Sequence, residues 1–457
     1  MATGLPPAPP PPGSPVSPLR SLHVVVVAPH LPPRHVGGVE VYAQSQLAAL
    51  ASLGHTVQGV AVEAVLRGEA GACTADDDHA AGYPTHRLQL TLPSTQPFPM
   101  LCDHAAAEDW LYAFFNRTRP DVVHLHSGYL LGAPVLAAAR RAATPVVLTI
   151  HDYWFTCPRI TLLHPDGRLC SGPERPAKCA WCLTADQRRH RLLDRVTGGA
   201  VSRGQDRSWL WRLLMSGPES AVAGRKARLL ALVETAAAVL APTRFVADRL
   251  GALGYPVERI QLSRYGLPPQ PRPARRPSDT LRLAFIGQLA PHKGVHLLID
   301  AVRTLAGRPV SLAVHGPLTP HPSYVAQLQA RAAGDPRITF HGPYRRGDLP
   351  DLLAASDVVV VPSVWHEVAA LVIQEAQLAA VPVLSSNLGG SPELVADEQD
   401  GLLFDPWRPG DLVRQITRLL DEPGLLPALT AGASRRRPLH DELETLVGLY
   451  RAVGRPA

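Results

Sequence analysis

Several kinds of residue are scarce in this sequence of 457 amino acids. Aromatic residues make up 5% and charged residues 18%, and there are only 3 methionines and 6 cysteines. No run approaches the roughly 18 apolar residues of a membrane-spanning helix. The first apolar run, at residues 24–28, is also shorter than the roughly 7 to 15 apolar residues of a secretory signal. We therefore expect a cytoplasmic protein without a membrane span.

The charge balance and the few cysteines exclude further classes of protein. The chain has 45 Lys and Arg against 39 Asp and Glu, a net charge of +6 that gives no argument for nucleic-acid binding. Cysteines in a chain without an export signal are better explained as thiols or metal ligands than as disulfides. Hydrophobic residues make up 46%, and a chain of this length is too long for one core, so we expect two domains.

Short apolar runs occur in two series, separated by amphipathic stretches. The runs show no polar alternation, which is typical of strands buried on both faces of a parallel sheet. The runs are residues 22–28, 122–125 and 146–150 in the first series and residues 283–287, 312–315, 358–361 and 381–385 in the second. The sequence therefore predicts an α/β fold with two doubly wound, Rossmann-like domains that face a cleft.

Composition gives the expected boundaries. Residues 1–20 are rich in proline and are predicted to be a disordered tail, and residues 267–280 combine prolines with charges, as a linker does. The N-terminal domain then covers residues 21–266 and the C-terminal domain residues 281–436. Residues 437–457 are expected to contain a C-terminal helix, for which packing against the N-terminal domain is one option.

Two glutamates follow the apolar run at residues 358–361. Glu367 lies in the next loop or at a helix start, and Glu375 lies about two turns further along that helix. Carboxylates at the carboxyl edge of a parallel sheet can accept hydrogen bonds from ligand hydroxyl groups, and the helix N-terminus between them can bind phosphate. An arbitrary pair of glutamates eight positions apart would more often be a cap and a solvated helix residue.

The context of these glutamates resembles the signature of the family 4 retaining glycosyltransferases, which have the GT-B fold. That signature is a glutamate, seven residues and a second glutamate, followed by a glycine pair and another glutamate. The matching residues are Glu367, Glu375, Gly389, Gly390 and Glu393. The resemblance implies that Glu367 contacts the donor sugar during catalysis, that Glu375 contacts the ribose, and that all five belong to the donor site.

A glycine turn, GQLAPHKG at residues 287–294, extends the resemblance. Gly287 lets the backbone approach a ligand, and Lys293 resembles the family's diphosphate-binding lysine. Without the glutamates, such a lysine would more often be a surface residue. Two departures from the family pattern are Gln288, where many members have arginine, and residues 368–370; both leave the affinity for the donor open.

The N-terminal half offers less specific candidates. Gly37 and Gly38 precede a helix, and in the family this loop faces the donor phosphates. Alternation places His124 and His126 on the same side of a strand. Because His126 lies at the strand end, we expect it to reach the cleft and to act in catalysis. The HDYW segment at residues 151–154 is expected to add a polar and aromatic surface for a sugar.

The resemblance covers residues 22–450 and implies an activity. It implies retaining transfer from a nucleotide-diphosphate sugar to a glycan, lipid-linked or small-molecule acceptor, in cell-surface polysaccharide or glycoconjugate synthesis and without a catalytic metal. Two alternatives remain open: a noncatalytic sugar-nucleotide-binding scaffold of a polysaccharide assembly complex, and a nucleotide-sugar epimerase.

Four cysteines fall within one loop-like stretch of the N-terminal half. They are Cys157, Cys170, Cys179 and Cys182. A CxxC pair with two further cysteines nearby can surround one tetrahedral ion. A structural zinc is the favoured interpretation, and an iron–sulfur cluster or four unrelated thiols are alternatives because the other spacings are irregular.

Residues 188–215 alternate arginines with apolar residues. Such basic segments lie on anionic membrane surfaces, which would suit a peripheral position on the inner face of the membrane. An ordinary helix with its apolar side in the core is an equal alternative, because Trp209 and Trp211 would not share one helical face.

Overall fold

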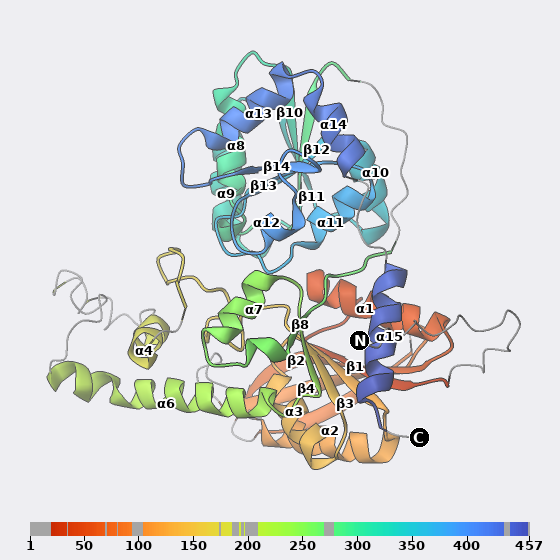
Figure 1. Cartoon of the computed structure of the whole chain (residues 1–457). Coiled ribbons are helices and arrows are strands. Elements are labelled where there is room, and N and C mark those ends of the chain that lie inside the picture. Colours follow the sequence, from red (N-terminus) through yellow and green to blue (C-terminus); the bar gives the residue numbers. More distant parts are fainter. Residues whose placement is uncertain are drawn as a thin grey trace, which may run out of the picture.

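The chain forms two domains, each built on a parallel sheet with helices on its faces (Figure 1). The computed structural model describes residues 20–33, 35–68, 71–79, 81–93, 104–172, 175–184, 192, 196, 209–268, 278–433 and 439–455. The two series of apolar runs form the two sheets. The predicted fold, α/β with two doubly wound domains, is confirmed.

The N-terminal sheet has the strand order β3-β4-β2-β1-β5-β6-β7-β8, and only β3 and β4 pair antiparallel. Its strands are β1 (His23–Ala28), β2 (Thr56–Gly68), β3 (Cys73–Asp78), β4 (Thr85–Pro93), β5 (Val122–His126), β6 (Val146–Thr149), β7 (Ala238–Ala241) and β8 (Ile260–Leu262). The apolar runs of β1, β5, β6 and β7 are buried almost throughout. This burial explains why they lack polar alternation.

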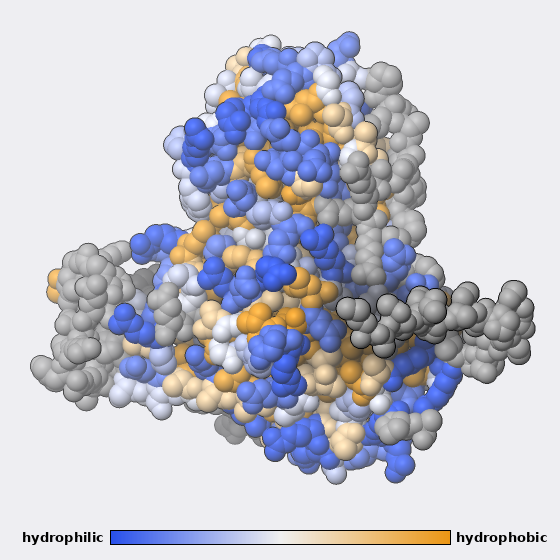
Figure 2. All heavy atoms as spheres, viewed as in Figure 1, coloured by the Kyte–Doolittle hydropathy of each residue, from blue (hydrophilic) through white to orange (hydrophobic). Residues whose placement is uncertain are grey.

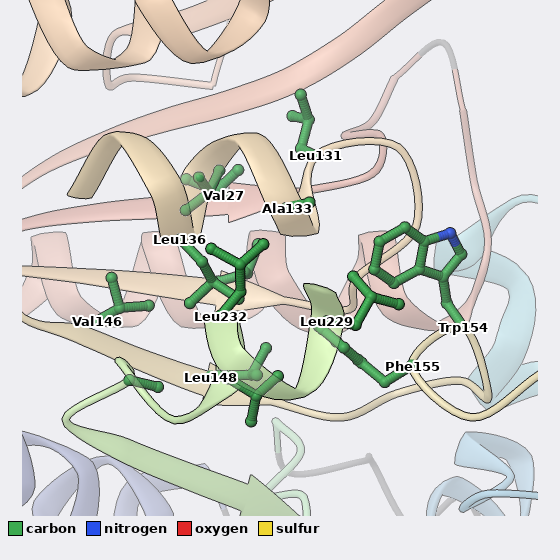
Figure 3. Close-up of a cluster of buried hydrophobic side chains, with 14 of the residues drawn as sticks. Val27, Leu131, Ala133, Leu136, Val146, Leu148, Trp154, Phe155, Leu229 and Leu232 are labelled. Carbon is green, nitrogen blue, oxygen red and sulfur yellow. The ribbon is translucent and has the colours of Figure 1, made fainter. Parts of the chain in front are cut away.

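Helices cover both faces of this sheet. The helices of this domain are α1 (Gly38–Ser52), α2 (Ala105–Thr118), α3 (Gly132–Arg141), α4 (Pro176–Thr184), α6 (Trp209–Val233), α7 (Arg244–Gly251) and the short η2 (Val257–Arg259). Of these, α4 packs against α6 and not on the sheet. On one face, Leu229 and Leu232 of α6 pack in the same buried cluster as Leu136 of α3 and Leu148 of β6 (Figure 3). These contacts attach the long helix α6 to the domain by its C-terminal end.

The C-terminal sheet is wholly parallel, with the order β11-β10-β9-β12-β13-β14. Its strands are β9 (Leu281–Ile286), β10 (Val310–His315), β11 (Ile338–Gly342), β12 (Val358–Val361), β13 (Val383–Ser386) and β14 (Gly401–Phe404). Its helices are η3 (Pro291–Lys293), α8 (Val295–Thr304), α9 (Pro322–Ala332), η4 (Arg346–Asp348), α10 (Leu349–Ala354), α11 (Leu371–Leu378), α12 (Ser391–Leu394), α13 (Asp411–Asp421) and α14 (Leu425–Gly432). Separate buried clusters lie on its two faces.

The last helix, α15 (Leu439–Val453), lies on the N-terminal domain (Figure 1). Leu443, Leu446 and Tyr450 are buried in one cluster with Val24 of β1 and Leu47 of α1. The chain therefore crosses from the first domain to the second and returns. Among the described helices, none is long and apolar enough to cross a membrane.

In both sheets the strand order reverses beside the first strand, between β1 and β5 and between β9 and β12. Open α/β sheets bind ligands beyond the carboxyl ends of their strands at such reversals. The predicted donor and acceptor loops follow these four strands. On the face that Figure 2 shows, hydrophilic and hydrophobic residues intermix, so the surface does not by itself mark a site. The site is therefore defined by the strand ends.

Candidate active site

The loops after β9 and β12 are in direct contact. Gly287 follows β9, and Gly294 ends the turn with a φ of 70°. A Cβ atom at Gly294 would lie 1.8 Å from the carbonyl oxygen of Pro362, so only glycine allows this approach. The contact places Lys293, the residue before Gly294, against the loop that carries Glu367.

Lys293 and Glu367 form an ion pair in which the carboxylate is buried and the lysine side chain is 24% exposed. The distance from Lys293 Nζ to Glu367 Oε1 is 2.8 Å, and the Ser363 hydroxyl also donates to Oε1. Burial by itself raises the pKa of Glu367, but Lys293 and these hydrogen bonds outweigh it and hold the pKa below its ordinary value. Glu367 is therefore ionised at neutral pH, while Lys293 also lies 5.0 Å from the centre of the Trp365 ring.

Glu375 lies on α11 and is 2% exposed. Its carboxylate pairs with Arg346 of η4, whose side chain is 39% exposed. Burial, followed by the charge of Glu375, raises the pKa of the neighbouring Tyr344 phenol. Glu375 is thus a buried carboxylate whose cation partner reaches solvent.

The glycine pair packs beneath the Glu367 loop. Gly389 has a φ of 60°, and a Cβ there would lie 2.5 Å from the carbonyl oxygen of Glu367. The Gly390 amide donates to that same oxygen at 2.7 Å, and a Cβ on Gly390 would lie 2.1 Å from the carbonyl oxygen of Val368. The pair therefore fixes the backbone on which Glu367 stands. Glu393 instead bonds to backbone amides of α7 in the other domain.

Gly37 and Gly38 lie where α1 meets α11. Gly37 is the N-cap of α1, and a Cβ on Gly38 would lie 3.5 Å from Cδ1 of Leu371, the first residue of α11. The N-termini of two helices, one from each domain, are therefore neighbours. Their free N–H groups and helix dipoles favour an anion at this position.

The structure corrects the expectation that His126 reaches open cleft. His126 still belongs to β5, where it pairs with Thr149 of β6, and its side chain is as fully buried as that of His124. The rings of His151 and Tyr42 cover it. Burial, with the neighbouring histidines, lowers its pKa well below the ordinary value, so the ring is neutral. Nδ1 contacts His151 Nε2 at 2.9 Å, and Nε2 has no hydrogen-bond partner among the described residues.

The HDYW segment likewise does not present an open surface. His151, Tyr153 and Trp154 are each less than 8% exposed, and the Tyr153 hydroxyl donates across the domain interface to the carbonyl oxygen of His366 at 3.0 Å. Tyr153 is buried against the Glu367 loop, whereas His151 and Trp154 are buried within the N-terminal domain. The segment therefore joins the domains, and the expected sugar-facing surface is not seen.

Two contributors were missed in the sequence. Arg346 had no signal, because only the fold brings η4 to Glu375. Thr243 follows β7 at the same edge of the sheet and contacts the Glu367 loop through Val368; the rule that ligand-side residues follow parallel strands could have found it.

The four predicted metal ligands line one cavity. Cys157, Cys170, Cys179 and Cys182 share it with His164, and burial together with the other three cysteines raises the pKa of the Cys179 thiol to about 12. However, no three His, Cys, Asp or Glu side chains in the described part of the chain are arranged so as to hold a metal ion. The zinc thus stays a prediction.

The segment 188–215 lies mostly outside the described residues, as does the tail up to residue 19 and the centre of the linker, residues 269–277. The expected membrane contact is a prediction that the structure does not address.

The chain has the GT-B fold that its structural neighbours, solved glycosyltransferases, also have. Sucrose-phosphate synthase from Thermosynechococcus elongatus superimposes with a TM-score of 0.65 at 19% identity, covering 95% of this chain and 99% of that chain. HepE from Anabaena, in complex with UDP and glucose, has a TM-score of 0.62 at 17% identity, covering 94% and 100%. At these identities the likeness shows the fold alone.

Sequence comparison then gives the family. The profile described as "Glycosyl transferase 4-like domain" matches residues 37–266, half of the chain, and that described as "Glycosyl transferases group 1" matches residues 269–436. The chain belongs to the family 4, or group 1, glycosyltransferases, so the resemblance seen in the sequence is confirmed.

Relatives of known activity share different lengths with the chain. The 2-deoxystreptamine glucosyltransferase of Streptomyces kanamyceticus is 29% identical over 331 residues, which is 71% of this chain and 72% of that enzyme. The D-inositol 3-phosphate glycosyltransferase of Streptomyces bingchenggensis is 34% identical over 182 residues, 38% of each chain. The chain therefore matches less than half the length of the second enzyme.

Proposed function

We propose that this chain is a retaining glycosyltransferase that moves a sugar from a nucleotide-diphosphate sugar to an acceptor held by the N-terminal domain. The observation that carries the proposal is the ion pair of Lys293 and Glu367, 2.8 Å apart where β9 and β12 end. At this position Lys293 can bind a diphosphate, and Glu367 beside it can accept a hydrogen bond from a sugar hydroxyl.

The donor would lie between the domains. Its diphosphate would bind Lys293 and the neighbouring N-termini of α1 and α11, where free N–H groups favour an anion. Glu367 would accept a hydrogen bond from a sugar hydroxyl, and Glu375 would accept one from the ribose after the solvent-reaching Arg346 turns away. The HepE structure contains UDP and glucose, which supports a nucleoside diphosphate as the leaving group of the donor.

The transfer step would proceed on one face of the sugar. The acceptor hydroxyl forms a bond to the anomeric carbon as the bond to the diphosphate oxygen breaks, and the acceptor proton passes to that oxygen. Glu367 is held by Lys293 and Ser363 and would position the sugar, while Lys293 would stabilise the charge that develops on the leaving diphosphate. A catalytic role for His126 would require the covering rings of Tyr42 and His151 to move, because its neutral ring is fully buried.

The acceptor would be a glycan, a lipid-linked sugar or a small molecule, with a role in polysaccharide or glycoconjugate synthesis. The name of the 2-deoxystreptamine enzyme supports the small-molecule option, and a membrane contact through residues 188–215 would suit a lipid-linked acceptor. A noncatalytic scaffold would keep the donor contacts without turnover, and an epimerase would release an altered nucleotide-sugar.

A structural zinc ion held by Cys157, Cys170, Cys179 and Cys182 is a separate part of the proposal. It is supported by the CxxC spacing and by the one cavity that the four thiols line. The ion would stabilise the insert between β6 and α6 and would take no part in the transfer.

The test begins with a thermal-shift screen of UDP-, GDP-, ADP- and TDP-sugars, because a ligand that binds only the folded state raises its apparent stability. The donor so identified is then incubated with candidate acceptors. We expect release of the nucleoside diphosphate, and a product whose NMR spectrum shows the anomeric configuration of the donor. An inverted product would disprove the retaining mechanism, and a free altered nucleotide-sugar would indicate the epimerase.

A further inference from the structure

The first turn of α7 is capped from the other domain. α7 begins at Arg244, and its N-cap residue Thr243 has extended backbone angles, φ −141° and ψ 153°, that suit a capping side chain. Thr243 does not cap, because its hydroxyl donates to the carbonyl oxygen of Val368 at 3.1 Å. The first N–H groups of α7 therefore need another acceptor.

Glu393 supplies that acceptor with both carboxylate oxygens. Oε2 accepts from the Arg244 amide at 2.7 Å, and Oε1 accepts from the Phe245 amide at 2.8 Å. A carboxylate at a helix N-terminus is favoured both by these bonds and by the helix dipole. Glu393 lies on α12 of the C-terminal domain, so this cap spans the interface.

The same residue is tied to the loop that carries Glu367. The Glu393 amide donates to the carbonyl oxygen of Gly390 at 3.1 Å, and the Gly390 amide donates to that of Glu367 at 2.7 Å. A Cβ on Gly390 would lie 2.8 Å from Cγ2 of Thr243. The capped end of α7 therefore sits directly on the glycine turn beneath Glu367.

Two further contacts lie along the same seam. The Tyr153 hydroxyl bonds to the carbonyl oxygen of His366 at 3.0 Å, and the rings of Phe245 and His366 are 4.9 Å apart. Both contacts are made to His366, the residue before Glu367. The contacts of α7 and of the loop after β6 thus converge on residues 366–368.

We infer that Glu393 is a positioning residue which latches the acceptor domain onto the Glu367 loop. It would act at the interface rather than as a donor ligand, because both of its carboxylate oxygens are directed at backbone amides of α7. The inference rests on the proposed function and deepens it: the latch holds the acceptor's domain in register with the donor sugar. Most of the proposed nucleotide contacts, which are Lys293, Glu375 and the N-terminus of α11, belong to the C-terminal domain, so nucleotide binding would depend on the latch far less than transfer does.

The test compares Glu393→Ala and Glu393→Gln with Glu398→Ala, a matched control. Glu398 is an exposed glutamate of the same domain that pairs with Arg418. Amide hydrogen exchange is measured at Arg244 and Phe245, since amides at a helix start lack intrahelical partners and exchange fast unless capped. We expect protection of both amides in the wild type and control, a loss of protection in Glu393→Ala, and a partial loss in Glu393→Gln, which keeps one accepting oxygen.

Kinetics and binding separate the latch from a donor ligand. With an active donor and acceptor pair, we expect Glu393→Ala to lower kcat by about 10-fold or more, with nucleotide affinity by calorimetry within about 2-fold of wild type. Weaker nucleotide binding with the two amides still protected would overturn the latch and make Glu393 a donor ligand. Unprotected wild-type amides would also overturn it. If the wild type transfers no sugar, the proposed function fails, while the exchange experiment still decides on the latch.

Discussion

The hydroxyl of Tyr42 in α1 donates a hydrogen bond to the carboxylate of Glu442 in α15, 400 positions later in the chain. The other oxygen of Glu442 accepts the amide of Gly266 at 2.6 Å, just before the chain leaves the N-terminal domain. Both side chains are buried, and burial followed by the charge of Glu442 raises the pKa of Tyr42 well above its ordinary value. One carboxylate thus joins the first helix, the departing chain and the last helix.

Glu442→Ala should therefore destabilise the protein. The change leaves the Tyr42 hydroxyl and the Gly266 amide without their acceptor. This loss should lower the free energy of unfolding by about 2 kcal/mol or more. Denaturant titration would measure it, with the exposed Glu444→Ala on the same helix as control. Equal stability of the two variants would contradict the importance of this contact.

The ion pair of Lys293 and Glu367 should stabilise the fold at neutral pH and lose this contribution in acid. Because the folded pKa of Glu367 lies below 4.5, its ionised form contributes stability that is present above the unfolded pKa and is lost as pH falls through the folded pKa. The difference in unfolding free energy between wild type and Glu367→Gln should therefore shrink as the pH falls through the folded pKa of Glu367. In a Lys293→Ala background burial dominates and the pKa of Glu367 should rise, so the pH dependence of that difference should reverse. An unchanged profile in that background would show that Lys293 does not set the pKa.

Glu367→Ala and Glu375→Ala should fail in different ways. Glu367 is expected to position the reacting sugar, so its loss should lower turnover by about 100-fold or more while nucleotide binding survives. Glu375 is expected to hold the ribose, which does not react, so its loss should weaken nucleotide binding by about 1.5 to 3 kcal/mol. Calorimetry with the free nucleotide and transfer kinetics measure both effects. If both variants fold and both keep wild-type nucleotide binding and turnover, the assignment of the donor site is wrong.

The cysteine cavity should contain about one zinc ion per chain. Elemental analysis of protein purified in reducing buffer without added metal would measure it, and Cys179→Ser should lower the content while Cys73→Ser, outside the cavity, should not. Zinc below about a tenth of stoichiometry would disprove the site, and iron with a visible absorbance would indicate a cluster instead.

The fold could be predicted because burial leaves a local trace in the sequence. The valine runs of β1 and β12 lack alternation since both faces of each strand are covered. Prolines and charges indicated the linker, although Leu267 at its start is buried with Tyr42 and Tyr265. The pairing of Tyr42 with Glu442 left no such trace, because neither residue type nor spacing indicates a contact between residues so far apart.

The donor site was predicted in part for a related reason. Lys293 and Glu367 were found because they match the family's motifs after two buried strands, and the structure brings the two side chains together. The exposure of His126 was not predicted correctly, because its position at a strand end indicates where the side chain points but not what covers it. The rings of Tyr42 and His151 cover it. The cap that Glu393 provides could not be predicted, since it depends on how the two domains sit against each other.

The return of α15 to the N-terminal domain has a consequence for synthesis on the ribosome. Val24 and Leu47 are made early, but the surface that Leu443, Leu446 and Tyr450 cover stays exposed until α15 has been synthesised. The domain that is synthesised first is therefore completed after the second, whereas residues 281–433 contain both clusters of their own sheet and can close earlier. A nascent chain stalled short of residue 439 would carry an uncovered apolar stripe, the kind of surface that chaperones bind.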